Sequence, residues 1–139
     1  MRRNLRSTRQ RLLIIDYPRA FTGGVFIVLL AGCAARQTIS YHQDVYPVLK
    51  TNCLACHSPP DGKGYLKTRL SMESYRSLMQ GTRYGPVIIP GDSRKSIFNM
   101  LVEGRADASL RMPHQREAPL TAQEIEILRL WVDQGARDN

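Results

Sequence analysis

A close pair of cysteines followed by a histidine is the part of the sequence best suited to chemistry. The run reads Cys53-Leu54-Ala55-Cys56-His57. Cys-x-x-Cys-His is the attachment signature of c-type haem. Two thiols at this spacing can add across the two vinyl groups of the porphyrin, and the histidine then turns its ring toward the iron as the proximal ligand. These five residues predict one covalently bound haem c.

Other uses of the cysteine pair fit the sequence less well. A thioredoxin-like redox pair is expected beside a βαβ unit, and no strand-like alternation is visible. A structural zinc site needs four ligands, and no second pair follows the motif, while His42 and His114 are isolated. A structural lipoprotein whose cysteine pair holds no haem is a further alternative.

The second axial ligand of the iron has several candidates. Those that follow the motif are Met72, Met79, Met100, Met112 and His114. The first three lie on predicted helix faces, where methionine usually fills the core. Met112 lies in an irregular loop beside Pro113, which restricts that loop and lowers the entropy cost of ordering it. We therefore expect Met112 to be the distal ligand, with His114 as the main alternative.

The distal ligand decides the class of function. Ligation by His57 and Met112 raises the reduction potential and fills both axial positions, which favours electron transfer. An open or labile distal site would instead suit a haem enzyme or a gas or redox sensor. The sequence shows no nucleophile–base set and no phosphate-binding loop. We expect an electron carrier rather than an enzyme, working alone or as a subunit of a larger oxidoreductase, with redox proteins as donor and acceptor.

The third cysteine, Cys33, follows a segment typical of export signals. Residues 1–19 are rich in arginine and residues 20–31 are mostly apolar. At about 12 residues the apolar run is shorter than the roughly 20 that a membrane span needs, so it indicates a signal peptide. Residues 30–33, Leu-Ala-Gly-Cys, resemble a bacterial lipobox, which implies cleavage before Cys33 and a diacylglyceryl group on its sulfur. A plain signal peptide or an uncleaved anchor, with a chance cysteine, is the alternative.

These segments divide the chain and locate its charge. We expect a lipoprotein signal peptide at 1–32, a lipidated tether at 33–40 and a cytochrome c domain at 41–139. Six arginines and a single acid give the first segment +5 of the formal charge of +8. The domain has no long basic run, so nucleic acid is not an expected partner.

The expected location of the protein is the bacterial cell envelope, on the periplasmic side, anchored to the membrane by lipid. Ala34 favours the outer membrane by analogy with enterobacterial sorting.

The apolar pattern predicts an all-α fold of short helices wrapped around the flat cofactor. The expected helices cover residues 41–51, 71–81, 93–103 and 121–134. Pro47 is expected in the first turn of its helix or at a kink, and Ser71 is expected to cap the second helix. Residues 58–64 and 107–119 are expected to be loops.

The last helix has the clearest signals. Residues 121–124, Thr-Ala-Gln-Glu, form a capping box. Ile125, Leu128 and Trp131 then recur at helical spacing, and Gly135 ends the pattern.

Together these runs resemble the small class I cytochrome c domains, especially the planctomycete-type group. The similarity covers about residues 41–137 and is carried by the runs 44–49, 52–58, 85–92, 112–113 and 120–136. It implies the small single-haem cytochrome c fold, which is helical, with His57 and Met112 as axial ligands and backbone at 86–91 near the haem edge. In this group a second proline often follows Met-Pro, whereas here His114 follows.

Overall fold

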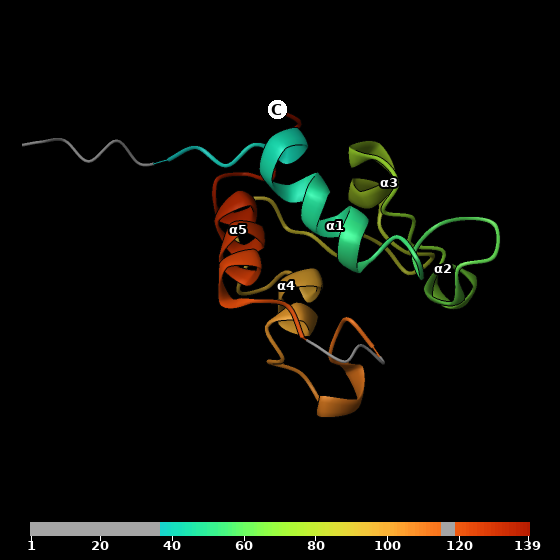
Figure 1. Cartoon of the computed structure of the whole chain (residues 1–139). Helices are drawn as coiled ribbons and strands as arrows, with labels where there is room; N and C mark the ends of the chain where they lie inside the picture. The colour runs from blue at the N-terminus through green and yellow to red at the C-terminus, as the bar shows by residue number, and fades with distance from the viewer. Residues whose placement is uncertain (1–36, 115–118) are drawn as a thin grey trace, which may run out of the picture. The chain divides into compact units, whose positions relative to one another are not determined.

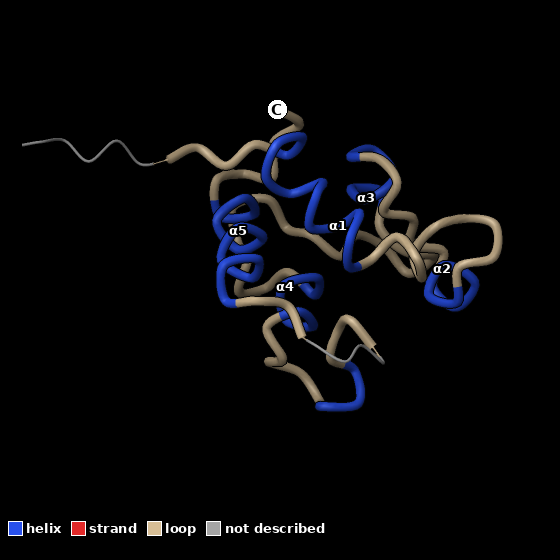
Figure 2. The backbone as a smooth tube through the Cα atoms, in the orientation of Figure 1, coloured by secondary structure: helices blue, strands red, loops and turns tan. Residues whose placement is uncertain are grey.

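Short helices joined by turns make up the part of the chain that the computed structural model describes, residues 37–114 and 119–139, which contains no β-strand (Figures 1 and 2). The elements in chain order are the π-helix η1 (Tyr41–Val45), α1 (Tyr46–Asn52), α2 (Lys63–Thr68), α3 (Tyr75–Gln80), α4 (Ile97–Val102), the 3₁₀-helix η2 (Ala108–Leu110) and α5 (Ala122–Asp133). This helical architecture agrees with the expected all-α class. The proposed signal peptide, the lipidation site Cys33 and the start of the tether lie outside the described residues. In the described segments, no helix has the length and apolar character needed to cross a membrane.

The first helical run leads straight into the cysteine motif. Ser40 caps it, since its hydroxyl accepts a hydrogen bond from the backbone N–H of Gln43. Pro47 stands in the first turn of α1, one of the two places expected for it, and follows directly on the π-helical turn η1. The helix ends at Asn52, and the N–H of Cys53 still bonds to the carbonyl of Leu49 at 2.8 Å.

The helix starts at α3 and α4 differ from the sequence prediction. Ser74, not Ser71, caps α3 in a reciprocal capping box with Ser77. Helix α4 begins at Ile97 rather than near residue 93. Both helices end beside the glycines that the sequence indicated, Gly81 and Gly104.

Helix α5 forms as predicted and organises the core. Thr121 and Glu124 make the capping box that the sequence indicated. Leu128, Trp131 and Val132 are buried to 1% exposure or less, and α5 contacts both η1 and α4. The core therefore joins η1, at the start of the domain, to α5, near its end.

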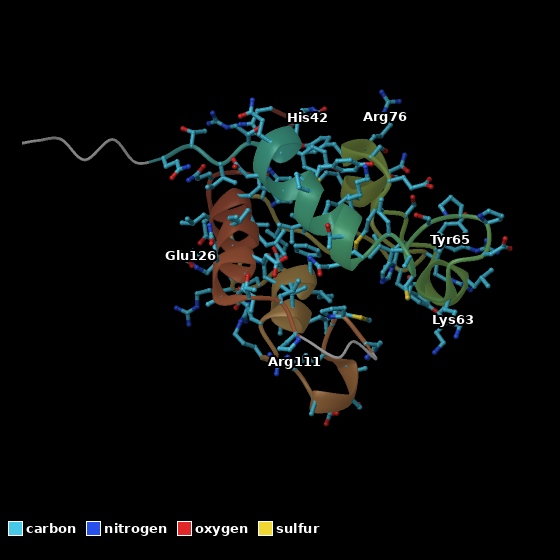
Figure 3. The ribbon with its side chains drawn as sticks, in the orientation of Figure 1. His42, Lys63, Tyr65, Arg76, Arg111 and Glu126 are labelled. Carbon is cyan, nitrogen blue, oxygen red and sulfur yellow. The ribbon has the colours of Figure 1, made fainter. Side chains whose placement is uncertain are left out.

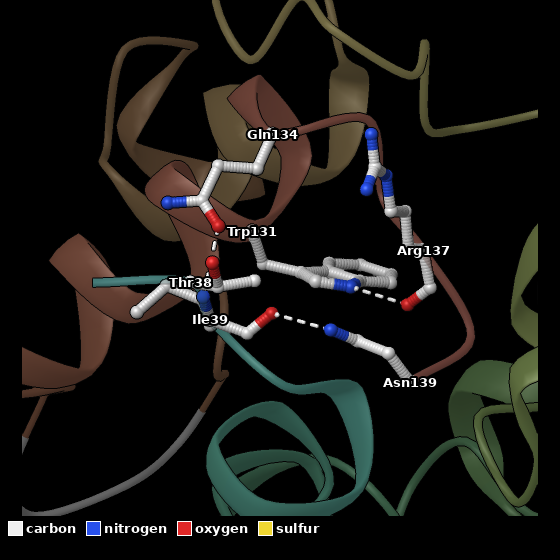
Figure 4. A pocket seen from close by; sticks show the side chains of 6 residues that line it. All are labelled: Thr38, Ile39, Trp131, Gln134, Arg137 and Asn139. Atoms are coloured by element: carbon white, nitrogen blue, oxygen red, sulfur yellow. Dashed lines mark hydrogen bonds between the residues drawn. The ribbon is translucent and has the colours of Figure 1, made fainter. Parts of the chain in front are cut away.

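The segment that enters the domain is fastened to the end of α5. The backbone N–H of Ile39 donates to Gln134 Oε1 at 2.8 Å, and Asn139 Nδ2 donates to the Ile39 carbonyl at 3.2 Å (Figure 4). Trp131 Nε1 donates to the carbonyl of Arg137 at 2.9 Å, which holds this C-terminal turn in place. The chain thus enters the domain at a defined point, beside α5.

Candidate functional site

The cysteine motif forms a helical turn that continues α1. The N–H groups of Cys56 and His57 both bond to the carbonyl of Cys53, at 3.1 and 2.9 Å. Cys53 is half-buried and packs against the hydrophobic core, while Cys56 is exposed. The fold therefore holds the two cysteines at its surface, where a large planar group can reach both.

The His57 ring is buried and oriented by a backbone carbonyl. His57 is 7% exposed, and its Nδ1 atom lies 3.3 Å from the carbonyl oxygen of Leu70. In the tautomer that donates from Nδ1 to this carbonyl, Nε2 keeps its lone pair for a metal, the usual arrangement of a ligating histidine. Burial lowers the pKa of His57, the hydrogen bond to Leu70 opposes that shift, and nearby His114 lowers the pKa further. The lowered pKa favours the neutral imidazole, the form in which a histidine can ligate a metal.

Helix α2 lies directly against the motif. The N–H of Tyr65 bonds to the Cys56 carbonyl at 2.9 Å. A Cβ built on Gly64 would lie 2.7, 2.8 and 3.0 Å from Cε1, Nε2 and Nδ1 of His57. Such similar distances put Gly64 over the face of the ring, so the glycine does not obstruct the in-plane direction in which Nε2 would bind a metal.

Gly62, just before α2, also packs too closely against the motif to carry a side chain. A Cβ on Gly62 would lie 2.5 Å from the carbonyl oxygens of both Cys56 and Ser58. Our prediction of a loop at 58–64 is thus wrong at its end, because α2 begins at Lys63. Gly62 and Gly64 allow α2 and the residue before it to pack tightly against the motif, in addition to favouring a loop.

The loop with Met112 and His114 approaches the same histidine. Met112 is half-buried and packs against the core, and its N–H donates to the carbonyl of Leu101 at the end of α4, at 3.1 Å. His114 is exposed, yet it lies close enough to His57 to affect that residue's pKa. The structure thus brings the predicted proximal histidine and the loop of the predicted distal ligand to one region.

The other methionines differ in their surroundings. Met72 is 5% exposed and belongs to the core, as its predicted packing role requires. Met79 is half-buried against the core, and Met100 is half-buried. The residue that the sequence analysis missed is Leu70, because a backbone carbonyl that orients a ring has no side-chain signature.

Comparison with known proteins gives one match. Residues 53–115 match the family described as Planctomycete cytochrome C. This match supports a planctomycete-type cytochrome c domain in the chain. The matched stretch begins at the first cysteine of the motif and ends just after the loop with Met112 and His114, so it spans the whole site. No curated protein and no solved structure gave a significant match.

The match confirms the family resemblance read from the sequence, and the cytochrome c family implies a covalently bound haem c. The cytochrome c domain has the residues for it, because Cys53 and Cys56 are both present at the surface and His57 is oriented by Leu70. A cytochrome c domain fits an electron carrier rather than an enzyme.

The close approach of α2 to the proximal histidine leads to a stability prediction. We expect Gly64→Ala to lower the free energy of unfolding by about 1–3 kcal/mol, because the added methyl overlaps the His57 ring and α2 must move. Urea unfolding followed by circular dichroism measures it. Lys67→Ala, on an exposed position of the same helix, is the control and should change stability by about 0.5 kcal/mol or less. Equal stability of G64A and wild type would contradict the tight packing.

Proposed function

We propose that this protein is an exported, lipid-anchored mono-haem c-type cytochrome that carries electrons between redox proteins. Cys53 and Cys56 form the thioether bonds, and His57 and Met112 are the axial ligands. The observation that carries the proposal is the buried His57 with its Nδ1 directed to the Leu70 carbonyl, inside a cytochrome c family motif.

The chain's own groups are arranged to keep the iron ligands fixed. When bound, the haem supplies a one-electron Fe(III)/Fe(II) couple. His57 is held by the Leu70 carbonyl on one side and Gly64 on its face. Met112 is held by core packing and by its backbone bond to Leu101. Ligands that stay in place in both oxidation states keep the structural rearrangement on electron transfer small.

A redox titration of the purified full-length protein tests the carrier function. We propose one Nernstian one-electron transition, a low-spin ferric spectrum and the weak long-wavelength band of methionine–iron ligation. A high-spin haem that binds carbon monoxide readily would contradict this proposal and favour the haem enzyme or sensor with an open distal site.

Membrane attachment rests on the lipobox at Cys33 and the short tether after it. Lipid at Cys33 together with an acylated amino group would give firm anchoring, since two or more chains exceed the marginal binding of one. The domain would then stay near the membrane surface on the periplasmic side, most simply at the outer membrane, and its effective concentration toward partners there would rise.

A single substitution separates attachment from haem chemistry. Cys33→Ser is expected to move the protein from the membrane fraction to the soluble periplasmic fraction or to leave it unprocessed, because the sulfur that accepts the lipid is gone. Fractionation with haem staining of each fraction measures this. Gln37→Ala, at an exposed position of the tether away from the lipobox, is the control and should stay with the membrane. Release of wild-type protein by a salt wash would refute a lipid anchor.

A further inference from the structure

The loop that carries Met112 is attached to the C-terminal end of α4. The backbone N–H of Met112 donates to the carbonyl of Leu101 at 3.1 Å, and the N–H of Gly104 donates to the same carbonyl at 3.3 Å. The Arg111 side chain lies across Gly104, because a Cβ built on that glycine would be 3.2 Å from Nε and 3.4 Å from Cζ of Arg111. Figure 3 shows Arg111 near the end of α4. The position of Met112 therefore depends on the last turn of this helix.

Arg105, just past that turn, holds the end of α4 through both its backbone and its side chain. Its backbone N–H donates to the carbonyl of Met100 at 2.8 Å. Its guanidinium donates through Nη1 to the Arg94 carbonyl and through Nη2 to the Ser93 carbonyl, both at 3.0 Å. Nε of the same group pairs with the carboxylate of Glu103. Each guanidinium nitrogen thus has an acceptor, and the three acceptors belong to two separate segments of the chain.

The turn that Arg105 contacts is itself fastened to the end of α5. The backbone N–H of Ser93 donates to Asp133 Oδ1 at 2.9 Å, and the N–H of Gly91 donates to the Val132 carbonyl at 2.8 Å. Ser93 is only 2% exposed, so this turn is packed into the domain. A continuous set of hydrogen bonds therefore leads from α5 through this turn and Arg105 to the end of α4, where the methionine loop is attached.

The surroundings of Glu103 show why this arginine is needed. The Glu103 side chain is 16% exposed and that of Arg105 36% exposed. The second carboxylate oxygen of Glu103, Oε1, is buried and has no hydrogen-bond partner among the described residues. Breaking a mostly buried ion pair by removing one partner is costly, because the other charge stays buried. Loss of the guanidinium should therefore displace the end of α4.

We propose that Arg105 is a positioning residue for the distal iron ligand, an inference that rests on the proposed ligation by Met112. By joining the end of α4 to the turn at 93–94, Arg105 fixes the loop that presents the Met112 thioether. It acts through the backbone of α4 and of the loop. A loop held in this way spends little time open, so an external ligand that needs the open loop binds weakly.

Binding of imidazole to the ferric, haem-loaded, full-length protein measures how often the loop is open. Imidazole must displace Met112 to reach the iron, and the displacement removes the long-wavelength band of methionine ligation. We expect Arg105→Gln to raise the apparent affinity for imidazole about tenfold, because a larger fraction of the molecules has an open loop. At a pH where imidazole is neutral, the lost charge of the arginine does not itself attract or repel the ligand.

Three further variants serve as controls and limits. Arg94→Gln removes an equal charge from the same turn but keeps the backbone carbonyl that Arg105 uses, and should change the affinity by less than about twofold. Ser74→Ala removes the side-chain cap of α3 and lowers stability away from the methionine loop, so imidazole binding should stay as in the wild type. Met112→Ala sets the upper limit of affinity, because nothing competes with imidazole.

The conservative substitution separates the charge from the shape of the guanidinium. Arg105→Lys keeps the positive charge, but a single ammonium nitrogen cannot reproduce the planar fork that meets three acceptors at once. We expect it to raise the affinity for imidazole about threefold, between the wild type and R105Q. If R105Q does not fold, R105K replaces it in the comparison.

Four results overturn the role of Arg105. The first two are imidazole binding as in the wild type by R105Q, or by R105K. In the third, R94Q gains as much affinity as R105Q, which would make the effect one of charge. In the fourth, S74A gains as much, which would make it one of general stability.

Hydrogen exchange of the Met112 amide separates this inference from the proposed function. That N–H donates to Leu101, and it should exchange about tenfold faster in R105Q than in the wild type, whichever side chain binds the iron. A wild type without the methionine band, which binds imidazole as M112A does, overturns the ligation in the proposed function. The exchange rate then still reports whether Arg105 holds the loop. A normal band with unchanged exchange and unchanged imidazole binding in R105Q overturns the role of Arg105 alone.

Discussion

Replacing both Cys53 and Cys56 by alanine is expected to remove covalent haem from the protein completely. Both thioether bonds then lack a sulfur, and coordination by His57 and a distal side chain does not survive denaturation. Haem-dependent peroxidase staining of a denaturing gel measures the loss, because only covalent haem remains on the band. The Cys33→Ala variant keeps both motif cysteines and should still stain. A double variant that stains like wild type would contradict the assignment of the motif.

The same double variant should be much less stable than the wild type. A domain of about 100 residues buries a modest core by itself. Its described helices are short, with 5 to 7 residues in each helical element before η2 and 12 in α5. Short helices depend on tertiary packing rather than on their own propensity. Circular dichroism should therefore show a lower and broader thermal transition without the haem.

Local signals in the sequence predicted α5 correctly because its start is decided locally. Thr121 and Glu124 satisfy each other's backbone donors within one turn. The motif at 53–57 was equally readable, since thioether chemistry requires those residue types at that spacing.

Tertiary hydrogen bonds explain why the predicted start of α3 was wrong. Ser71 is an adequate cap by type, but its neighbours bond to the haem motif. The Leu70 carbonyl faces His57 Nδ1, and the Met72 N–H donates to the His57 carbonyl at 2.9 Å. These bonds hold residues 70–72 outside a helix, so the next serine in position, Ser74, becomes the cap.

The late start of α4 has the same kind of cause. The N–H of Gly91 donates to the Val132 carbonyl at 2.8 Å, and the N–H of Ser93 donates to Asp133 Oδ1 at 2.9 Å. Both acceptors lie at the end of α5, about 40 residues away in sequence. The sequence of residues 91–96 gives no sign of these distant hydrogen-bond partners, so the start of α4 at Ile97 could not be predicted from it.

We expect Met112→Ala to lower the reduction potential by on the order of 0.1–0.2 V, a part of the roughly 0.8 V range that axial ligands span in haem proteins. The thioether raises the potential of a histidine-ligated haem, and alanine cannot reach or bind the iron. The ferric protein should lose the long-wavelength band of methionine ligation, turn toward high spin and bind carbon monoxide. A redox titration and visible spectra measure these changes.

Two further substitutions decide whether the effect belongs to ligation or to packing. Met79→Ala removes a thioether that is half-buried against the core, as the Met112 side chain is, and should leave the potential and the band nearly unchanged. His114→Ala tests the other side chain of the same loop, which lies within electrostatic reach of His57. If H114A moves the potential and M112A does not, His114 is the sixth ligand. If neither moves it, the loop holds no ligand, and the distal position is open or is filled by another of the candidate methionines. Because all three variants keep Cys53, Cys56 and His57, each outcome reports on the distal side alone.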